Sequence, residues 1–94
     1  MIDDVLISPG DVERLLAGRI RAARSRRGWS QQEMADRAGL GIATVARLER
    51  SGRGQLTSLV RIAAALDRLR DFEALLATGQ PRSLDELRRL RERP

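Results

Sequence analysis

The sequence predicts an all-α protein of five helices with short extensions at both ends, and three observations lead to this prediction. Apolar residues recur at spacings of three and four along most of the chain, as they do on one face of a helix. Capping residues stand before several of these stretches, and glycine or proline stands after them. The chain has one Trp, one Phe and no Tyr, so its core must be built from aliphatic side chains.

The length and charge of the chain are those of one small, basic domain. Its 94 residues suffice for a modest core. The 18 basic residues, all of them arginine, outnumber 13 acidic residues and give a net charge of +5. Arginine suits contacts with phosphate and guanine, although a GC-rich genome also explains the absence of lysine. Five arginines crowd one segment: Arg19, Arg21, Arg24, Arg26 and Arg27.

The missing residue types argue against an enzyme. The sequence contains no Cys, His or Tyr, which removes disulfides, common soft metal ligands, a nucleophilic thiol and the usual general base near neutral pH. We therefore expect no catalytic residue, no metal and no cofactor. No apolar run approaches the ~20 residues that a membrane-spanning helix needs, and no signal peptide opens the chain. We expect a cytoplasmic protein without a membrane partner.

The first helix is predicted from the run Ser8-Pro9-Gly10-Asp11 to about Arg27. Proline is tolerated in a first helical turn, and an acid suits the positive end of the helix dipole. Gly18 weakens the middle of this helix, so residues 11–17 form either its first half or a separate turn. The expected inward stripe consists of Val12, Leu15, Leu16, Ile20 and Ala23. The apolar cluster within residues 1–10 is a strand, a tether or a partly ordered tail.

Two short helices are predicted on either side of a Gly-Leu-Gly joint at residues 39–41. Ser30 and Glu33 form a capping box, which marks the start of a helix that Gly39 ends. The next helix fits residues 42–50, with Val45 and Leu48 three apart on one face. Two helices joined by such a short turn cross steeply and leave one of them free to enter a DNA major groove. The pattern is that of a helix-turn-helix.

The rest of the compact unit is predicted to complete the core. Trp29 is expected there, with a partner for its indole N–H, and stacking on nucleic acid is the alternative. The loop at residues 51–55 is a connector whose Arg53 can touch a DNA backbone. A helix follows, with an apolar pattern formed by Leu56, Leu59, Ile62, Ala63 and Leu66. After a turn at residues 67–71, a last helix is expected to carry Phe72, Leu75 and Leu76.

The tail at residues 78–94 is predicted to contain a short amphipathic helix. Ser83 and Glu86 form another capping box, and Leu84, Leu87 and Leu90 repeat at a spacing of three among arginines. Such a helix can close a dimer or lie in a partner's groove, whereas a disordered tail can hold phosphate. The sequence leaves these alternatives open.

The run LLAGRIRAARSRRGWSQQEMADRAGLGIATVARLER, followed by LTSLVRIAAAL, resembles the Cro and phage-repressor (XRE) family of helix-turn-helix proteins. The resemblance covers roughly residues 15–77. It implies a lambda repressor-like DNA-binding domain at residues 11–77, with extensions at residues 1–10 and 78–94. Within the family, the segments ISP, GWSQQEMA, IATV and LTSL are similar to those of the antitoxin that is paired with HipA-type kinase toxins.

The resemblance implies a role for each residue of the helix-turn-helix. Base readout falls to Gly41, Ile42, Ala43 and Arg47, and contacts with the DNA backbone fall to Gln31, Thr44, Arg50 and Arg53. Arg24 and Glu49 are expected to form an ion pair that orients the recognition helix. Gly41 departs from the usual Ser or Thr, and Ile42 faces either the DNA or the core. The expected dimer or partner contact is formed by Phe72, Leu75, Leu76, Leu84, Leu87 and Leu90.

One helix-turn-helix makes too few contacts for useful specificity, so we expect a homodimer on a palindromic operator of double-stranded DNA. The leading hypothesis is a sequence-specific repressor that regulates its own operon as the antitoxin of a toxin–antitoxin pair, with a toxin kinase as its protein partner. One alternative is a phage or mobile-element regulator without a toxin partner. The other is a protein-interaction module that neutralises a partner.

Overall fold

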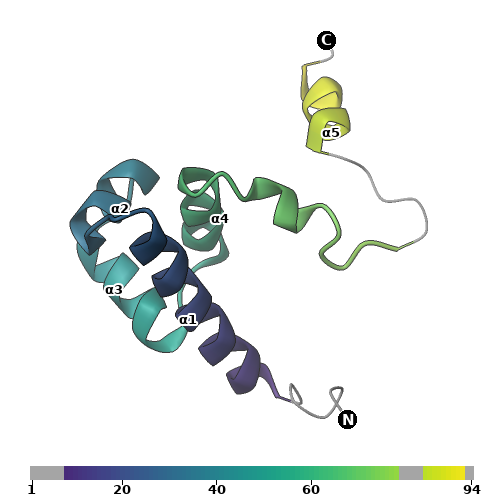
Figure 1. The fold of residues 1–94 in the computed structure, drawn as a ribbon. Helices are drawn as coiled ribbons and strands as arrows, with labels where there is room; N and C mark the ends of the chain where they lie inside the picture. Colours follow the sequence, from purple (N-terminus) through teal and green to yellow (C-terminus); the bar gives the residue numbers. More distant parts are fainter. Residues whose placement is uncertain (1–7, 79–83, 93–94) are drawn as a thin grey trace.

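The structure, a computed structural model, describes residues 8–78 and 84–92 of the chain, and within them it is entirely helical (Figure 1). The predicted all-α fold is confirmed, and the described residues form five α-helices, the fifth of which lies in the tail after residue 78. A 3-10 helix lies between the fourth and the fifth. The elements are α1 (Pro9–Arg26), α2 (Gln31–Ala38), α3 (Ile42–Ser51), α4 (Leu56–Ala65), η2 (Leu69–Phe72) and α5 (Leu84–Arg91). The apolar cluster predicted within residues 1–7 lies outside the described residues, as does Ser83.

Helix α1 begins where its capping sequence predicts. The Ser8 hydroxyl accepts a hydrogen bond of 3.2 Å from the Asp11 amide, and Pro9 occupies the first helical position. The helix continues through Gly18, so the separate turn at residues 11–17 does not form. Its inward stripe differs from the predicted one, because Ala17 is buried and Val12 is 41% exposed. With 18 residues, α1 is about 27 Å long and extends past its ten-residue neighbour α3, so its first turn lies beyond the core (Figure 1).

The joint between α2 and α3 is fixed by local hydrogen bonds. The predicted capping box is present, since the Glu33 amide donates to Ser30 Oγ at 3.0 Å and the Ser30 amide donates to Glu33 Oε1 at 3.1 Å. Gly39 adopts the left-handed conformation with a φ of 69°, and the next amide, of Leu40, donates to the carbonyl of Ala35 at 2.9 Å. The chain therefore reverses within three residues, as the glycine pattern predicts.

The core lies where α1 packs on α3 and where α2 packs on both α3 and α4. The side chains of Met34, Ala35 and Val45 are fully buried. Ala35 has a small side chain, which allows the helices to approach closely. The other buried members of the core are Ile20, Ala38, Leu48, Ile62 and Leu66.

Two residues predicted in the core lie at its edge instead. Leu56 is 67% exposed, since it stands at the first position of α4. Trp29 is half-buried and packs against the core from the link between α1 and α2. The guanidinium carbons of Arg37 and Arg27 lie 4.4 and 5.2 Å from the centre of its ring. The indole thus covers the core with one part of its surface and holds cations with another.

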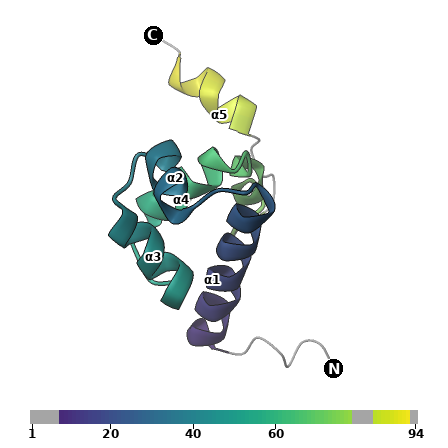
Figure 2. The same cartoon turned by 60° about the vertical axis from the view of Figure 1, so that its left-hand side comes forward.

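The prediction of an α-helix after residue 71 is wrong. The chain leaves α4 through Asp67, whose φ of 59° is left-handed, and makes only the short 3-10 helix η2. Leu76, with a φ of 57°, interrupts any further helical turn. Figures 1 and 2 both show α5 apart from the other helices. Among the described residues, no helix has the length and apolar content to span a membrane.

Candidate nucleic-acid interface

The start of α3 presents an open surface of small and apolar side chains. Gly41 caps the helix with extended backbone (φ −77°, ψ 153°) and offers no side-chain cap. Ile42 is 45% exposed, and Gly41 and Ala43 are also exposed. Of the two orientations expected for Ile42, the structure has the outward one. A base edge can therefore approach these three positions without displacing a core residue.

Arg47 lies one helical turn after Ala43 on the same face of α3, since residues four apart are neighbours on a helix. Its side chain is exposed. Among the described residues, the Arg47 guanidinium has no hydrogen bond, ion pair or ring contact. It is therefore free to make the two parallel hydrogen bonds with which an arginine binds guanine.

The end of α3 is held by a buried charge network around Glu49, whose side chain is 2% exposed. Arg24 of α1 donates from Nε to Glu49 Oε2 at 2.6 Å and from Nη2 to Oε1 at 2.9 Å. Gln31 of α2 donates from Nε2 to Oε1 at 3.1 Å, and Arg21 donates from Nη1 to the Glu49 carbonyl at 2.7 Å. The carboxylate therefore ties the recognition helix to both helices before it.

These contacts decide the ionisation of the pair. Burial raises the pKa of Glu49, but the hydrogen bonds from Arg24 and Gln31 and the charges of Arg24 and Arg21 outweigh it, so this pKa lies below its ordinary value. The hydrogen bond to Glu49 raises the pKa of Arg24 against the opposing effect of burial. Both groups are consequently charged at neutral pH, and the pair orients α3 as a fixed ionic contact.

The residues predicted to contact the DNA backbone differ in their exposure and in the contacts that they already make within the protein. Gln31 gives one amide hydrogen to Glu49, which leaves the other available. Thr44 is half-buried, whereas Arg50 is exposed and has no partner among the described residues. Arg53 Nε lies 3.4 Å from Glu13 Oε1 in an exposed ion pair, which is weak enough to open when phosphate approaches.

The residues predicted to form a dimer or partner contact do not come together in the described structure. Phe72 is half-buried, while Leu75 and Leu76 are 58% and 91% exposed. Leu87 is exposed on α5, a helix that both views show apart from the other α-helices (Figures 1 and 2). The side chains of Leu84 and Leu90 lie outside the described part of the chain.

Among the arginines near the end of α1, a structural role was predicted for Arg24 alone, whereas Arg21 and Arg27 are structural as well. Arg21 and Arg24 hold Glu49, and Arg27 donates from Nη2 to the Leu66 carbonyl at 2.6 Å. The spacing of three between Arg21 and Arg24 was the available signal, because it places both on one face of α1. Arg27 carries no such signal, since its acceptor is a backbone carbonyl 39 residues away.

Comparison with known proteins identifies the family of the chain. The family model described as helix-turn-helix matches residues 20–71, which is more than half of the chain and includes α2, α3 and α4. A search of curated proteins gives no match. Among the described residues, no three His, Cys, Asp or Glu side chains cluster as a metal site. The chain therefore belongs to the XRE-type helix-turn-helix family of DNA-binding transcription regulators.

Proposed function

We propose that the protein is a sequence-specific repressor that binds a palindromic operator upstream of its own gene as a homodimer. One observation carries this proposal: Gly41, Ile42, Ala43 and Arg47 are all exposed at the N-cap and in the first two turns of α3, and Ala43 and Arg47 lie on one face of this helix. The buried Arg24–Glu49 pair holds the other end of the same helix. A helix that reads a major groove needs exposed side chains and a fixed orientation, and α3 has both.

The chemistry of these four exposed residues suggests which bases they read. Arg47 binds the O6 and N7 atoms of guanine, and such a pair contributes about 1–3 kcal/mol of discrimination against other bases. Ile42 and Ala43 offer apolar surface to the methyl group of thymine. Gly41 allows the backbone to approach a base or a phosphate closely, since it has no side chain and nothing lies within 4 Å of a Cβ placed there.

Phosphate contacts then fix the position of the domain on the duplex. Gln31 stands at the first position of α2, where free backbone amides and the helix dipole attract an anion. Thr44, Arg50 and Arg53 complete the proposed backbone contacts. These groups bind any DNA sequence, so they supply affinity, while Arg47 supplies preference.

A homodimer supplies the second half-site, with recognition helices about 34 Å apart. The exposed Leu76 and Leu87 support a contact between copies, because such a contact removes both apolar side chains from water. Repression follows where the operator overlaps the promoter.

Binding to DNA is tested by fluorescence anisotropy with a labelled duplex from upstream of the gene and a scrambled duplex of equal composition. We expect the upstream duplex to bind more tightly at every salt concentration. Its affinity should fall by about 0.9 log units per log unit of salt for each phosphate neutralised. Equal binding of the two duplexes at moderate salt contradicts sequence-specific repression.

We further propose that the protein neutralises a kinase-type toxin encoded beside it. The resemblance of its segments to a HipA-paired antitoxin supports this role, and the exposed leucines offer a surface for a second protein. Co-expression with the neighbouring gene should restore the growth of a host that this gene alone arrests. A neighbouring gene that arrests growth equally in the presence of the protein rules out the antitoxin role without affecting the DNA-binding proposal.

A further inference from the structure

An apolar groove of about 810 Å³ runs along α1 where this helix faces α4 and η2. No residue that lines it comes from α2 or α3, and in Figure 1 α3 lies on one side of α1 while η2 lies on the other. The groove is therefore separate from the surface proposed to bind DNA. Its apolar lining includes Leu16, Ala23, Leu59, Leu66, Phe72 and Leu75.

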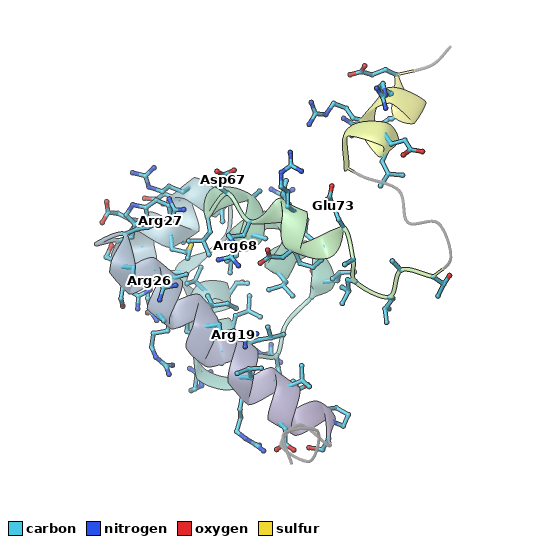
Figure 3. The ribbon with its side chains drawn as sticks, turned by 45° about the vertical axis from the view of Figure 1, so that its right-hand side comes forward. Arg19, Arg26, Arg27, Asp67, Arg68 and Glu73 are labelled. Carbon is cyan, nitrogen blue, oxygen red and sulfur yellow. The ribbon has the colours of Figure 1, made fainter. Side chains whose placement is uncertain are left out.

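Arginines border this apolar floor on the α1 side. Arg19 and Arg26 both line the groove and are exposed. They are seven residues apart, which places them on one side of α1 at an axial separation of about 10.5 Å (Figure 3). Among the described residues, neither guanidinium has a hydrogen bond or an ion pair. Two unneutralised cations thus stand beside apolar surface.

One end of the groove continues into a smaller pocket of about 280 Å³ that three arginines line. Arg27 is fixed there by its hydrogen bond to the Leu66 carbonyl, and Arg68 is fixed by an ion pair of 3.0 Å with Asp71. Arg26 completes the set (Figure 3). One acidic residue therefore balances only one of the three positive charges directly. The remaining charge favours a carboxylate at this end of the groove.

We propose that the groove binds an acidic amphipathic peptide segment of a protein partner. Its apolar side chains would cover Leu59, Leu66 and Phe72, and its carboxylates would pair with Arg19 and Arg26. Charge complementarity favours an acidic peptide over a purely apolar one, because an apolar peptide would leave Arg19 and Arg26 without ionic partners. A DNA backbone would pair with the arginines but leave the apolar floor unused. The partner can bind while α3 holds DNA.

The experiment uses the ¹⁵N-labelled full chain and a synthetic helical peptide of about 14 residues, which spans about 21 Å and so exceeds the groove length along α1. The peptide carries leucines on one face and glutamates on both sides of them. A matched peptide has lysine at every glutamate position. We expect the acidic peptide to shift the amide signals of Ala22, Ala23 and Leu66 and to leave those of Ala43 and Arg47 unchanged.

Charge-reversed variants locate the binding site. The double variant Arg19→Glu/Arg26→Glu should weaken binding of the acidic peptide by at least about tenfold, because like charges then meet across the groove. The matched double variant Arg47→Glu/Arg50→Glu carries the same change in net charge on α3 and should bind the peptide as the parent does. Both pairs of arginines are exposed, so the fold should persist, and the dispersion of the amide signals checks this.

Five outcomes would overturn the proposal. The first is no shift at peptide concentrations up to about 1 mM, and the second is equal binding of the lysine peptide. The third is tighter peptide binding by the variant Asp3→Lys/Asp4→Lys, which would make the chain's own acidic start the occupant. The fourth is a change in the sedimentation coefficient of Arg19→Glu/Arg26→Glu without any change in peptide affinity, which would assign the groove to a second copy. The fifth is a loss of DNA affinity in Arg19→Glu/Arg26→Glu without any loss of peptide affinity, which would assign the arginines to the DNA.

Discussion

The guanidinium of Arg24 holds the carboxylate of Glu49 through two parallel hydrogen bonds of 2.6 and 2.9 Å. Arg24 lies in the last turn of α1 and Glu49 near the end of α3, and their side chains are 15% and 2% exposed. Because the pair is nearly dry and bidentate, it fixes both the distance and the rotation of the recognition helix relative to α1. The surface of α3 that we propose to face DNA is thus positioned by a contact with α1 at the other end of this helix.

Arg24→Ala should lower the free energy of unfolding by about 3 kcal/mol or more, because it leaves the Glu49 carboxylate buried without its main partner. Urea denaturation followed by the fluorescence of Trp29, the only tryptophan, measures this. Arg26→Ala is the matched control on the same helix, and its loss should stay within about 0.5 kcal/mol, as for other exposed sites. Similar losses in the two variants would show that the pair contributes little to stability.

The same pair predicts how stability depends on pH. The pKa of Glu49 is lower in the folded protein than in the unfolded chain, so the folded state binds fewer protons at this site. The stabilisation is complete above the unfolded pKa of about 4.3 and is lost as the pH falls through the folded value. Glu49→Gln should therefore be less stable than the parent at neutral pH, with a difference that narrows below about pH 4. A difference that is constant over this range contradicts the prediction.

Gly52→Ala should destabilise the fold more than Gly28→Ala does. Both glycines have left-handed backbone, with φ of 73° and 72°, which costs a residue with a side chain about 1–2 kcal/mol. A Cβ at Gly28 meets nothing within 4 Å, whereas one at Gly52 overlaps the backbone carbonyl of Glu13 in α1. The difference between the melting temperatures of the two variants measures the effect of the clash, because the cost of the left-handed backbone is common to both. Equal melting temperatures would show that α1 moves away from the added methyl group.

The parts of the fold that depend on local sequence were predictable. The capping box of Ser30 and Glu33 and the left-handed Gly39 are each formed by residues within a few positions, so the sequence determines them directly. The same holds for the start of α1 at Ser8 and Pro9. The helix-turn-helix could therefore be located from the chain alone.

The wrong predictions concern contacts between distant segments. Periodicity selects Val12 for the core, but the length of α1 relative to α3 leaves it exposed. It also predicts a helix through Leu76, but the left-handed turn at Asp67 redirects the chain as it leaves α4. The contacts around the site were unpredictable for the same reason. The hydrogen bond from Arg27 to the Leu66 carbonyl, for example, depends on where α4 ends. No pattern within α1 or α4 alone predicts these features.

Arg47→Ala should reduce the preference for the operator without changing the fold. Its guanidinium has no partner among the described residues, so its loss removes no contact within the protein. We expect the affinity for the upstream duplex to fall by about 1–3 kcal/mol, while the affinity for scrambled DNA falls much less. Competition binding with both duplexes measures the ratio. A ratio equal to that of the parent protein would assign base readout to Ile42, Ala43 or the shape of the DNA instead.

Arg50→Ala should weaken binding to both duplexes by a similar factor. Arg50 is exposed on α3 three residues after Arg47, and as a proposed phosphate contact it attracts any DNA sequence. The slope of log affinity against log salt should therefore become shallower by about 1, because one fewer counterion is released. Arg61→Ala, an exposed arginine of α4 at a position with no proposed DNA contact, is the control and should leave the slope unchanged. A loss confined to the upstream duplex would show that Arg50 reads a base, and it would extend the specific contacts along α3 beyond Arg47.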